Sequence, residues 1–280
     1  MAVVVPEIFA DAVNEKMDVS LRIGRVAFDA TDMVPEITEC GDKVNFPSID
    51  RISGAEVMTK GNELTPSELS MSDNEAEIKQ VGSAVRVYDK DAKQVKGRVI
   101  DNLAEQIGQE IAKAVDGDLV DEMDANAAYK TVVAQPEGLT LLEVEAGIDV
   151  FGDDIDDDTF AGIIINSRLR SNFLGFENFV KTDYANMNDA NGKAINGCIG
   201  YFHGVIPVIV CNNKTYDSDK NECKTYIVKK NSLGIIVQKE VSSEEQRESL
   251  KKATLLSADK FYAVKLLNSK GVSILRHTVA

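Results

Sequence analysis

Apolar residues recur at a nearly constant interval over residues 94–124. One position in four is aliphatic or methionine from Val95 to Met123. Because an α-helix turns once per 3.6 residues, a stripe with a period of four drifts by about 40° at each step. The pattern therefore predicts a helix of roughly 45 Å whose apolar face winds, so that different neighbours cover its two ends. Gly108, inside this pattern, permits either close packing or a bend.

A second amphipathic pattern lies near the start of the chain, within residues 1–34. Phe9, Val13 and Met17 recur at four-residue intervals and share one side of a predicted helix. That helix has an apolar face that requires a covering surface.

The segment 195–212, INGCIGYFHGVIPVIVCN, places three glycines around two short apolar runs. Gly197, Gly200 and Gly204 can take positive φ or allow a close backbone approach, so the spacing predicts two strands joined by a tight turn. Pro207 lies in the second run and cannot donate to a ladder, so we expect that strand at a sheet edge.

Residues 42–75 read as a long hairpin with a polar, turn-rich tip, and Pro47 in its first arm suggests an edge strand. In the strand that follows, Ile78 and Val81 lie on opposite parities. An extra residue reverses the face of a strand, so we expect a bulge beside Gly82.

Short helical and strand patterns alternate from residue 135 onward. After an acidic link at residues 240–252, the chain reads as a C-terminal hairpin, with strands at 253–267 and 272–279 and a turn at 268–271. If this hairpin pairs with strands that precede the long helix, residues 135–240 form an insertion between two sequence-distant halves of one domain.

Composition and charge are those of a globular chain large enough for two modest domains. The 280 residues are 44% hydrophobic and 28% charged, and no apolar run approaches the length of a bilayer, which predicts a soluble protein without a membrane partner. The N-terminus lacks the pattern of a secretory signal. The net charge of -15 argues against a surface that grips nucleic acid. A small basic cluster is interpreted as a solvated face rather than a DNA contact; it comprises Lys90, Lys93, Lys96 and Arg98.

The cysteines do not form a metal-binding pattern. No CxxC pair occurs, and only two histidines are available, so free thiols in a reducing cytoplasm are preferred to zinc. These residues are Cys40, Cys198, Cys211, Cys223, His203 and His277. His203 could serve Cys198 as the base of a nucleophilic pair, or it could be a hydrogen-bonded residue of the turn between the strands. The turn histidine is favoured because no third, orienting group stands at a recognisable spacing.

The acidic run at residues 153–158 begins like a calcium loop, with aspartates at every second position: Asp154, Asp156 and Asp158. Thr159 stands where the sharp-turn glycine belongs, and Ile165 where the bidentate glutamate belongs. A solvated loop is therefore favoured, and the segment 217–222 fails the same test and reads as a hairpin turn. Phosphate-loop, dinucleotide, zinc-protease and hydrolase motifs are missing, so we expect no enzyme, no cofactor and no metal.

Three blocks follow one another in an informative order: QVGSAVRVYDKDA, EIAKAVDGDLVDEM, and the region from INSRLRSNF to GVIPVIVCN. Their order and spacing resemble the major capsid proteins of tailed bacteriophages, which have the Hong-Kong-ninety-seven-type capsid fold. The resemblance implies an α+β fold with an N-terminal arm, an extended β-hairpin loop, a peripheral domain with a long spine helix, and an inserted axial domain. The implied boundaries are 1–41 for the arm, 42–75 for the loop, 76–134 and 241–280 for the peripheral domain with its spine helix at 94–124, and 135–240 for the axial domain.

The same resemblance implies a structural protein that self-assembles into the icosahedral head enclosing phage double-stranded DNA. Its partners would be other copies in pentamers and hexamers, together with scaffolding, portal and decoration proteins. It would be made in the host cytoplasm and end in the virion. An encapsulin-like nanocompartment shell and an acidic-loop metal-dependent enzyme are the alternatives.

Candidate contacts between subunits follow from the arm, the extended loop and the last turn. They are Phe9, Val13, Met17, Arg51, Lys60, Glu63 and Asn268. Some relatives crosslink a loop lysine to a neighbouring asparagine, which would match Lys60 and Asn268, although a solvated lysine and a plain turn asparagine are favoured. We expect segments 1–34 and 42–75 to become ordered only against other copies of the chain.

Overall fold

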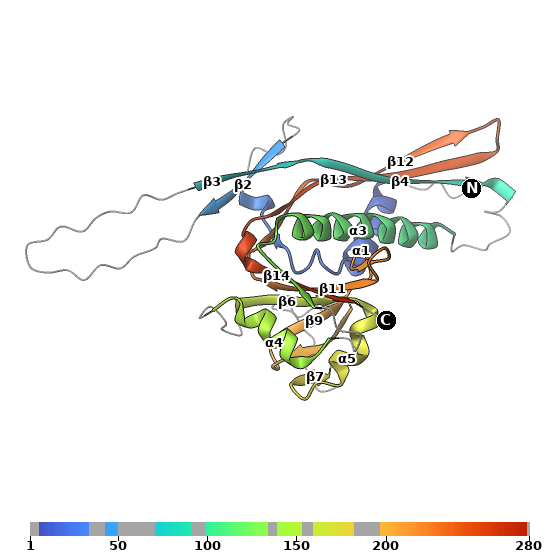
Figure 1. The fold of residues 1–280 in the computed structure, drawn as a ribbon. Helices are drawn as coiled ribbons and strands as arrows, with labels where there is room; N and C mark the ends of the chain where they lie inside the picture. The colour runs from blue at the N-terminus through green and yellow to red at the C-terminus, as the bar shows by residue number, and fades with distance from the viewer. Residues whose placement is uncertain are drawn as a thin grey trace, which may run out of the picture.

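The long helix lies between two β-sheets, and the N-terminal helix packs beside it (Figure 1). The computed structural model describes residues 6–33, 43–49, 71–90, 99–133, 139–152, 159–181 and 197–278. The spine helix α3 spans Val99–Asn126 and the N-terminal helix α1 spans Pro6–Ser20. The helix predicted at 94–124 is thus confirmed from residue 99 and extends slightly further, whereas residues 94–98 lie outside the described part of the chain.

The apolar stripe of α3 drifts as predicted. Its first half packs in one cluster with α1, through Ala104, Ile107 and Ile111. Its second half packs in another cluster through Leu119 and Met123, which also contains side chains of both sheets. Different neighbours therefore cover the two ends of the helix.

The upper sheet in Figure 1 has the strand order β1-β12-β13-β4. Its strands are β1 (Phe28–Asp29), β12 (Leu233–Glu248), β13 (Ala253–Leu266) and β4 (Lys79–Tyr88). β12 and β13 form a long antiparallel ribbon with register shifts between Val237 and Ser242. The acidic link expected at residues 240–252 is wrong, because most of that segment is strand β12 and the turn that follows it.

The extended hairpin begins with β2 (Lys43–Ile49) and β3 (Met71–Glu77), which pair only with each other among the described strands. Pro47 therefore lies in an edge strand, as predicted. At the base, Val44 and Phe46 are buried in a cluster with upper-sheet side chains. The base thus satisfies its apolar surface within its own chain, contrary to expectation, while residues 50–70 lie outside the described residues.

The change of face before β4 does not involve a bulge. β4 pairs with β13 in unbroken register from Lys79 to Tyr88, so the bulge predicted beside Gly82 is wrong. The parity switches at Ile78, which separates β3 from β4. A break between two strands that belong to different sheets has the same effect on the sequence pattern as an inserted residue.

The lower sheet has the order β5-β14-β11-β6-β9-β8-β7, with β10 paired to β11. Helices α4 (Leu141–Asp149) and α5 (Arg170–Leu174) belong to this lower half, as does a short 3-10 turn at Ser167–Leu169. Two further 3-10 turns lie at Thr31–Met33, beside β12 of the upper sheet, and at Ser269–Gly271, between β13 and β14. Its strands are β5 (Tyr129–Val133), β6 (Phe160–Ile165), β7 (Phe179–Lys181), β8 (Cys198–Phe202), β9 (Ile206–Val210), β10 (Tyr216–Asp217), β11 (Glu222–Lys229) and β14 (Val272–Thr278).

The glycine-spaced turn forms as predicted between β8 and β9. Gly197 and Gly204 have φ of 79° and 78°. A Cβ on Gly200 would lie 2.4 Å from the carbonyl oxygen of Val180, so only glycine fits this approach of β8 to β7. The edge position predicted for β9 is wrong, because β9 lies between β6 and β8. Its ladder with β6 begins at Val208, one residue after Pro207, so the missing N–H lies outside that ladder.

The predicted C-terminal hairpin is also wrong. β13 lies in the upper sheet, whereas β14 lies in the lower sheet between β5 and β11. The turn between them carries the chain past the end of α3, where Ala128 N–H donates to the carbonyl of Ser269 at 2.9 Å. The chain also crosses between the sheets at residues 230–232, earlier than the boundary expected at residue 240.

Gly108 is a point of close approach between α1 and α3. A Cβ there would lie 2.9 Å from the Met17 nitrogen and 3.0 Å from the Val13 oxygen, both backbone atoms. We predict that Gly108→Val lowers the free energy of unfolding by about 2 to 3 kcal/mol, because the helices must separate. Urea unfolding followed by circular dichroism measures this loss.

Gly117→Ala in the same helix is the matched control. A Cβ at Gly117 meets the ends of the Asn213 and Lys214 side chains, which can move. This variant should stay within about 1 kcal/mol of wild type, because better helix propensity offsets the adjustment. Equal losses in both variants would contradict the close-packing role of Gly108.

Candidate functional site

Three of the side chains predicted at subunit contacts lie in the core of their own chain. Phe9, Val13 and Met17 are 2%, 0% and 1% exposed and pack against α3. They are therefore core residues, and the expectation that residues 1–34 find cover only on another copy is wrong for α1. The periodicity identified the apolar face correctly, but an apolar face does not specify which surface covers it.

The other candidate contacts remain predictions. Arg51, Lys60 and Glu63 lie outside the described residues. Asn268 is exposed, and its Oδ1 accepts a hydrogen bond from Lys270 N–H at 3.0 Å. This is the geometry of a turn asparagine.

The described residues instead bring together four aspartates on the second half of α3. The first, Asp116, is 4% exposed and accepts backbone N–H groups from the segment after α1. Arg22, Ile23 and Gly24 donate at 3.1, 3.0 and 2.9 Å. Burial raises the pKa of this carboxyl to about 6, against the opposing effect of the three N–H donors. Asp116 thus fixes the chain that leaves α1 to the spine helix.

Two further aspartates each hold a buried tyrosine, one from each sheet. Asp118 accepts from the Tyr262 hydroxyl of β13 at 2.9 Å, and Asp124 accepts from the Tyr226 hydroxyl of β11 at 2.9 Å. Burial, with the nearby carboxylate, raises the pKa of both phenols. Lys79 of β4 lies 3.1 Å from Asp118, so the upper sheet is attached by two strands.

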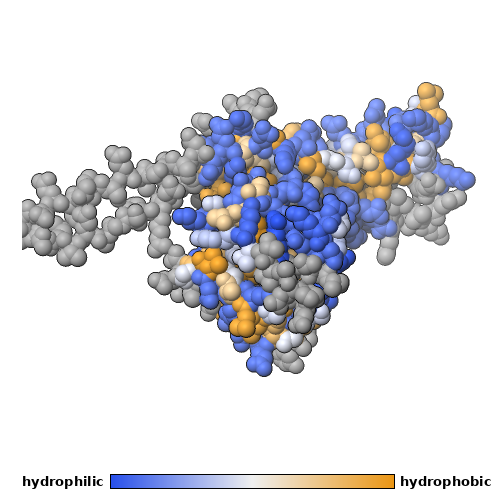
Figure 2. Space-filling model, in the orientation of Figure 1, coloured by the Kyte–Doolittle hydropathy of each residue, from blue (hydrophilic) through white to orange (hydrophobic). Residues whose placement is uncertain are grey.

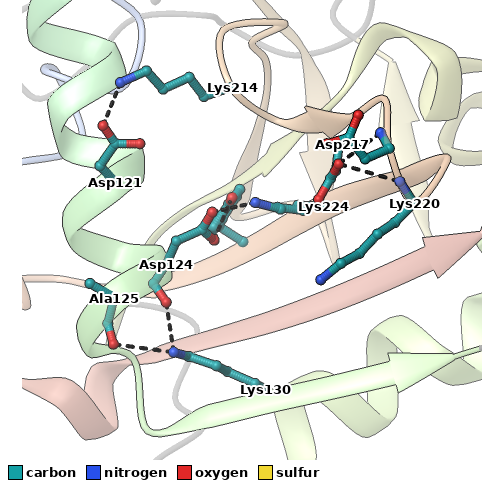
Figure 3. A network of polar contacts seen from close by, with 10 residues as sticks. Asp121, Asp124, Ala125, Lys130, Lys214, Asp217, Lys220 and Lys224 are labelled. Carbon is teal, nitrogen blue, oxygen red and sulfur yellow. Dashed lines mark hydrogen bonds and ion pairs between the residues drawn. The ribbon is translucent and has the colours of Figure 1, made fainter.

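Three lysines of the lower half bind the C-terminal part of α3 (Figure 3). Lys224 of β11 pairs with Asp124, and Lys214 pairs with Asp121. Lys130 donates to the carbonyls of Asp124 and Ala125 at 2.6 and 3.2 Å, where the helix ends. A cation at this position also interacts favourably with the helix dipole.

We call Asp116, Asp118, Asp121 and Asp124 the aspartate joint. Its members bind the N-terminal segment, the upper sheet and the lower sheet to one helix. Each of these contacts joins parts of the same chain.

Cys198 and His203, the candidate nucleophilic pair, have separate partners. Cys198 is buried and its Sγ donates to the Gly200 carbonyl at 3.3 Å, while burial raises the pKa of its thiol. His203 Nε2 lies 3.0 Å from Glu145 Oε1 of α4. The hydrogen-bonded turn histidine is therefore the arrangement observed. Cys211 and Cys223 are also free and buried, and Cys40 lies outside the described residues.

Of the two acidic segments singled out in the sequence, only 217–222 lies within the described residues. Residues 153–158 lie outside the described residues. Asp217 begins the turn between β10 and β11, and its Oδ1 accepts from Asp219 N–H at 3.0 Å, which confirms the predicted hairpin turn. In the described ranges, no group of three His, Cys, Asp or Glu residues could hold a metal ion. None of the helices described there is both long and apolar enough to cross a membrane.

The middle of the visible face is largely polar, and apolar patches lie among polar side chains toward the lower end (Figure 2). The large exposed apolar side chains of the lower half are Leu142, Val150, Val180 and Val205. The contact between His203 and Glu145 places the β8–β9 turn, which includes Val205, against α4. At the other extreme, Leu250 at the turn of the β12–β13 ribbon is 99% exposed.

The aspartate joint was not recognised from the sequence. The segment DGDLVDEMD shows four aspartates beside a buried helical stripe. Acidic residues that flank a buried stripe must find donors or lose solvation, which is the signal that could have indicated the joint. The sequence could not indicate the donors, because they come from residues about 90 to 150 positions away.

Asp116→Asn tests the joint through its pH dependence. The folded pKa of about 6 exceeds the ordinary value of 3.8, so the folded state binds the proton more tightly. The contribution of this carboxyl to stability is complete below pH 3.8 and is lost as the pH rises through 6. We predict that wild type gains about 1 kcal/mol over Asp116→Asn between pH 7 and pH 5, measured by urea unfolding.

At pH 7 the variant should be less stable by about 1 to 3 kcal/mol, because at least one buried N–H loses its acceptor. A difference between the two proteins that stays constant with pH would contradict the dominance of burial. A difference in unfolding free energy that shrinks toward pH 5 would show that the three N–H donors affect the pKa of Asp116 more than burial does.

Comparisons with known proteins give similarity in structure only. No protein-family model matches the chain, and no curated protein is significantly similar in sequence. The capsid of Ralstonia phage GP4 matches with a TM-score of 0.65 at 13% identity, over 91% of this chain and 87% of that one. The capsid of cyanophage P-SCSP1u matches with a TM-score of 0.64 at 13% identity, over 93% and 89%. A virus-like particle from Pyrococcus furiosus matches with a TM-score of 0.64 at 13% identity, over 98% of this chain and 100% of that one.

These matches span nearly the whole chain and nearly the whole of each neighbour. The α+β fold implied by the sequence resemblance is thus confirmed. The chain has the Hong-Kong-ninety-seven-type fold of phage capsid proteins.

Proposed function

We propose that this chain is the major capsid protein of a tailed phage, which self-assembles into an icosahedral head around double-stranded DNA. The observation that carries the proposal is the fold match to phage capsids over more than nine-tenths of this chain. The proposed role is structural and requires no catalytic group.

The distribution of contacts supports a subunit built for interlocking. The hairpin of β2 and β3 and the ribbon of β12 and β13 project from opposite ends of the body (Figure 1). The base of each is anchored in the core, by Phe46 in β2 and by Ile235 in β12. A rigid base with a projecting end allows a subunit to reach its neighbours without loosening its own fold.

The charge distribution fits a container that encloses nucleic acid without gripping it. The net charge is -15, and several cations of the described residues are paired with carboxylates of the same chain. Examples are Lys214 with Asp121, Lys224 with Asp124, and Arg247 with Asp89. Paired lysines and arginines are poor ligands for phosphate, since binding DNA requires cations free to displace counterions.

The partners follow from the proposed role. Copies of the chain would form pentamers and hexamers, with scaffolding, portal and decoration proteins as further partners, and the protein would move from the host cytoplasm into the virion. The extended loop would lie over a neighbouring subunit through Arg51, Lys60 and Glu63. Asn268 would meet a neighbour at the exposed turn after β13.

A shell that encloses protein cargo is the second candidate. The match to the Pyrococcus furiosus virus-like particle covers 98% of this chain and all of that one, so the fold supports both containers. Genomic neighbours separate the two: terminase, portal and protease genes for the phage, or a cargo enzyme for the compartment.

Negative-stain microscopy of the expressed protein tests shell formation, with a variant designed from the hairpin. Ile49 and Met71 are paired across β2 and β3, so Asn-Gly can replace residues 50–70 as a two-residue turn. We predict closed particles for wild type. The shortened variant should keep its unfolding midpoint but form no shells, because its core is intact and its reach to neighbours is lost.

The controls separate the competing functions. Replacing Asp154, Asp156 and Asp158 together with Asn should leave the shells unchanged, whereas a metal-dependent enzyme would lose its activity. If wild type remains a monomer at high concentration, the shell proposal fails. If the shortened hairpin still assembles normally, the role assigned to the loop fails.

Assembly should quicken as salt is added. Subunits of charge -15 repel one another, and salt screens that repulsion over a length of about 8 to 10 Å in physiological buffers. Light scattering of purified subunits across a salt series measures the initial rate. Slower assembly at higher salt would indicate that attraction between opposite charges dominates the encounter.

A further inference from the structure

The outer edge of the upper sheet is a long strand without a partner strand. β4 runs for ten residues, Lys79–Tyr88, and pairs on one side with β13. Among the strands that the structure describes, none pairs with its other side. In an antiparallel pair, alternate N–H and C=O groups point away from the neighbour, so this side presents a row of open hydrogen-bonding groups.

β4 lacks the features that usually protect such an edge. It contains no proline, and its register with β13 shows no bulge. Its two cations do not guard the edge, because each has a carboxylate partner in its own chain. Lys79 lies 3.1 Å from Asp118, and Arg86 lies 3.0 Å from Glu248. A ten-residue edge without uncompensated charge favours pairing with another strand.

We propose that β4 is an interface between two copies of the chain, in which two β4 strands pair antiparallel about Ser83 and join their upper sheets across a twofold axis. This inference rests on the proposed shell and specifies one of its contacts. A twofold axis that relates two antiparallel strands in one sheet brings like faces together. Residues opposite each other must then have the same parity.

The residues of β4 fit that requirement. The odd positions 81, 83, 85 and 87 are half-buried, and the even positions are exposed. With the axis at Ser83, Val81 of each copy lies opposite Val85 of the other copy, and Gln80 lies opposite Arg86. The two Val81–Val85 pairs beside the axis favour this register, in which Lys79 lies opposite Val87. With the axis at Ala84 instead, Ser83 would oppose Val85, which mismatches a hydroxyl with an apolar side chain.

A disulfide crosslink tests the contact and its register together. In a Cys40→Ser background, Ser83→Cys places two thiols opposite each other, with Cα atoms about 4.5 to 5.5 Å apart, within the range of a disulfide. Ser257→Cys is the matched control, because Ser257 lies opposite Ala84 on β13, one strand inward. Two such residues would be three strand spacings apart, about 14 Å, which a disulfide cannot span.

Assembled shells of each variant are oxidised with a mild agent and analysed by denaturing electrophoresis without reductant. We expect Ser83→Cys to shift from monomer to dimer and Ser257→Cys to remain monomeric. Intact shells in which Ser83→Cys stays monomeric would overturn the β4 interface and leave the shell proposal standing. Dimers in both variants would also overturn it, since they would indicate non-specific oxidation.

If no shells form, concentrated subunits are oxidised in the same way. A dimer specific to Ser83→Cys would then support the strand pairing while the shell proposal fails. A monomer would overturn both. The three buried cysteines occur in every sample and so do not distinguish the variants.

Discussion

Burial of one long helix between two sheets is the interaction on which the rest of the subunit depends. Helix α3 contributes Leu119 and Met123 to a cluster that includes Tyr262 of the upper sheet and Tyr226 of the lower sheet. Removing these side chains from water stabilises both sheets at once, because both sheets contribute side chains to this one cluster. The aspartate joint fixes how each sheet is oriented on the helix, because hydrogen bonds are directional and apolar contacts are not. The two halves of the subunit are therefore coupled through a single element.

Under the proposed shell function, this coupling lets one chain combine a packed core with segments that extend from it. The body does not require a neighbour in order to bury α1 or the base of the hairpin, since Phe9 and Phe46 are covered by their own chain. In the proposed shell, contacts with other copies would use the periphery: the hairpin of β2 and β3, the ribbon turn with Leu250, the lower end with Leu142, and the edge of β4. A strongly acidic surface opposes indiscriminate association of such parts. Specific edges and projecting segments can then select the correct neighbours.

Local patterns predicted local structure well and the choice of partner poorly. The drift of the α3 stripe and the glycine-spaced turn of β8 and β9 follow from helix geometry and backbone sterics, which act over a few residues. The sheet that a strand joins is decided by contacts far along the chain, so β14 was assigned to a hairpin with β13 and β9 to an edge. The same limit applied to α1, whose apolar face was recognised but assigned to another copy. The aspartate joint was missed because its donors are distant in sequence.

Hydrogen–deuterium exchange on free subunits and on assembled particles tests most directly whether the body is self-contained. Amides of α1 and of the middle of α3 should already be protected in the free subunit, since both helices are buried there by the same chain. Amides on the open side of β4 should gain protection only on assembly. Rapid exchange throughout α1 in the free subunit, with protection appearing only in particles, would contradict the account, because the N-terminal helix would then belong to the assembly and not to the core.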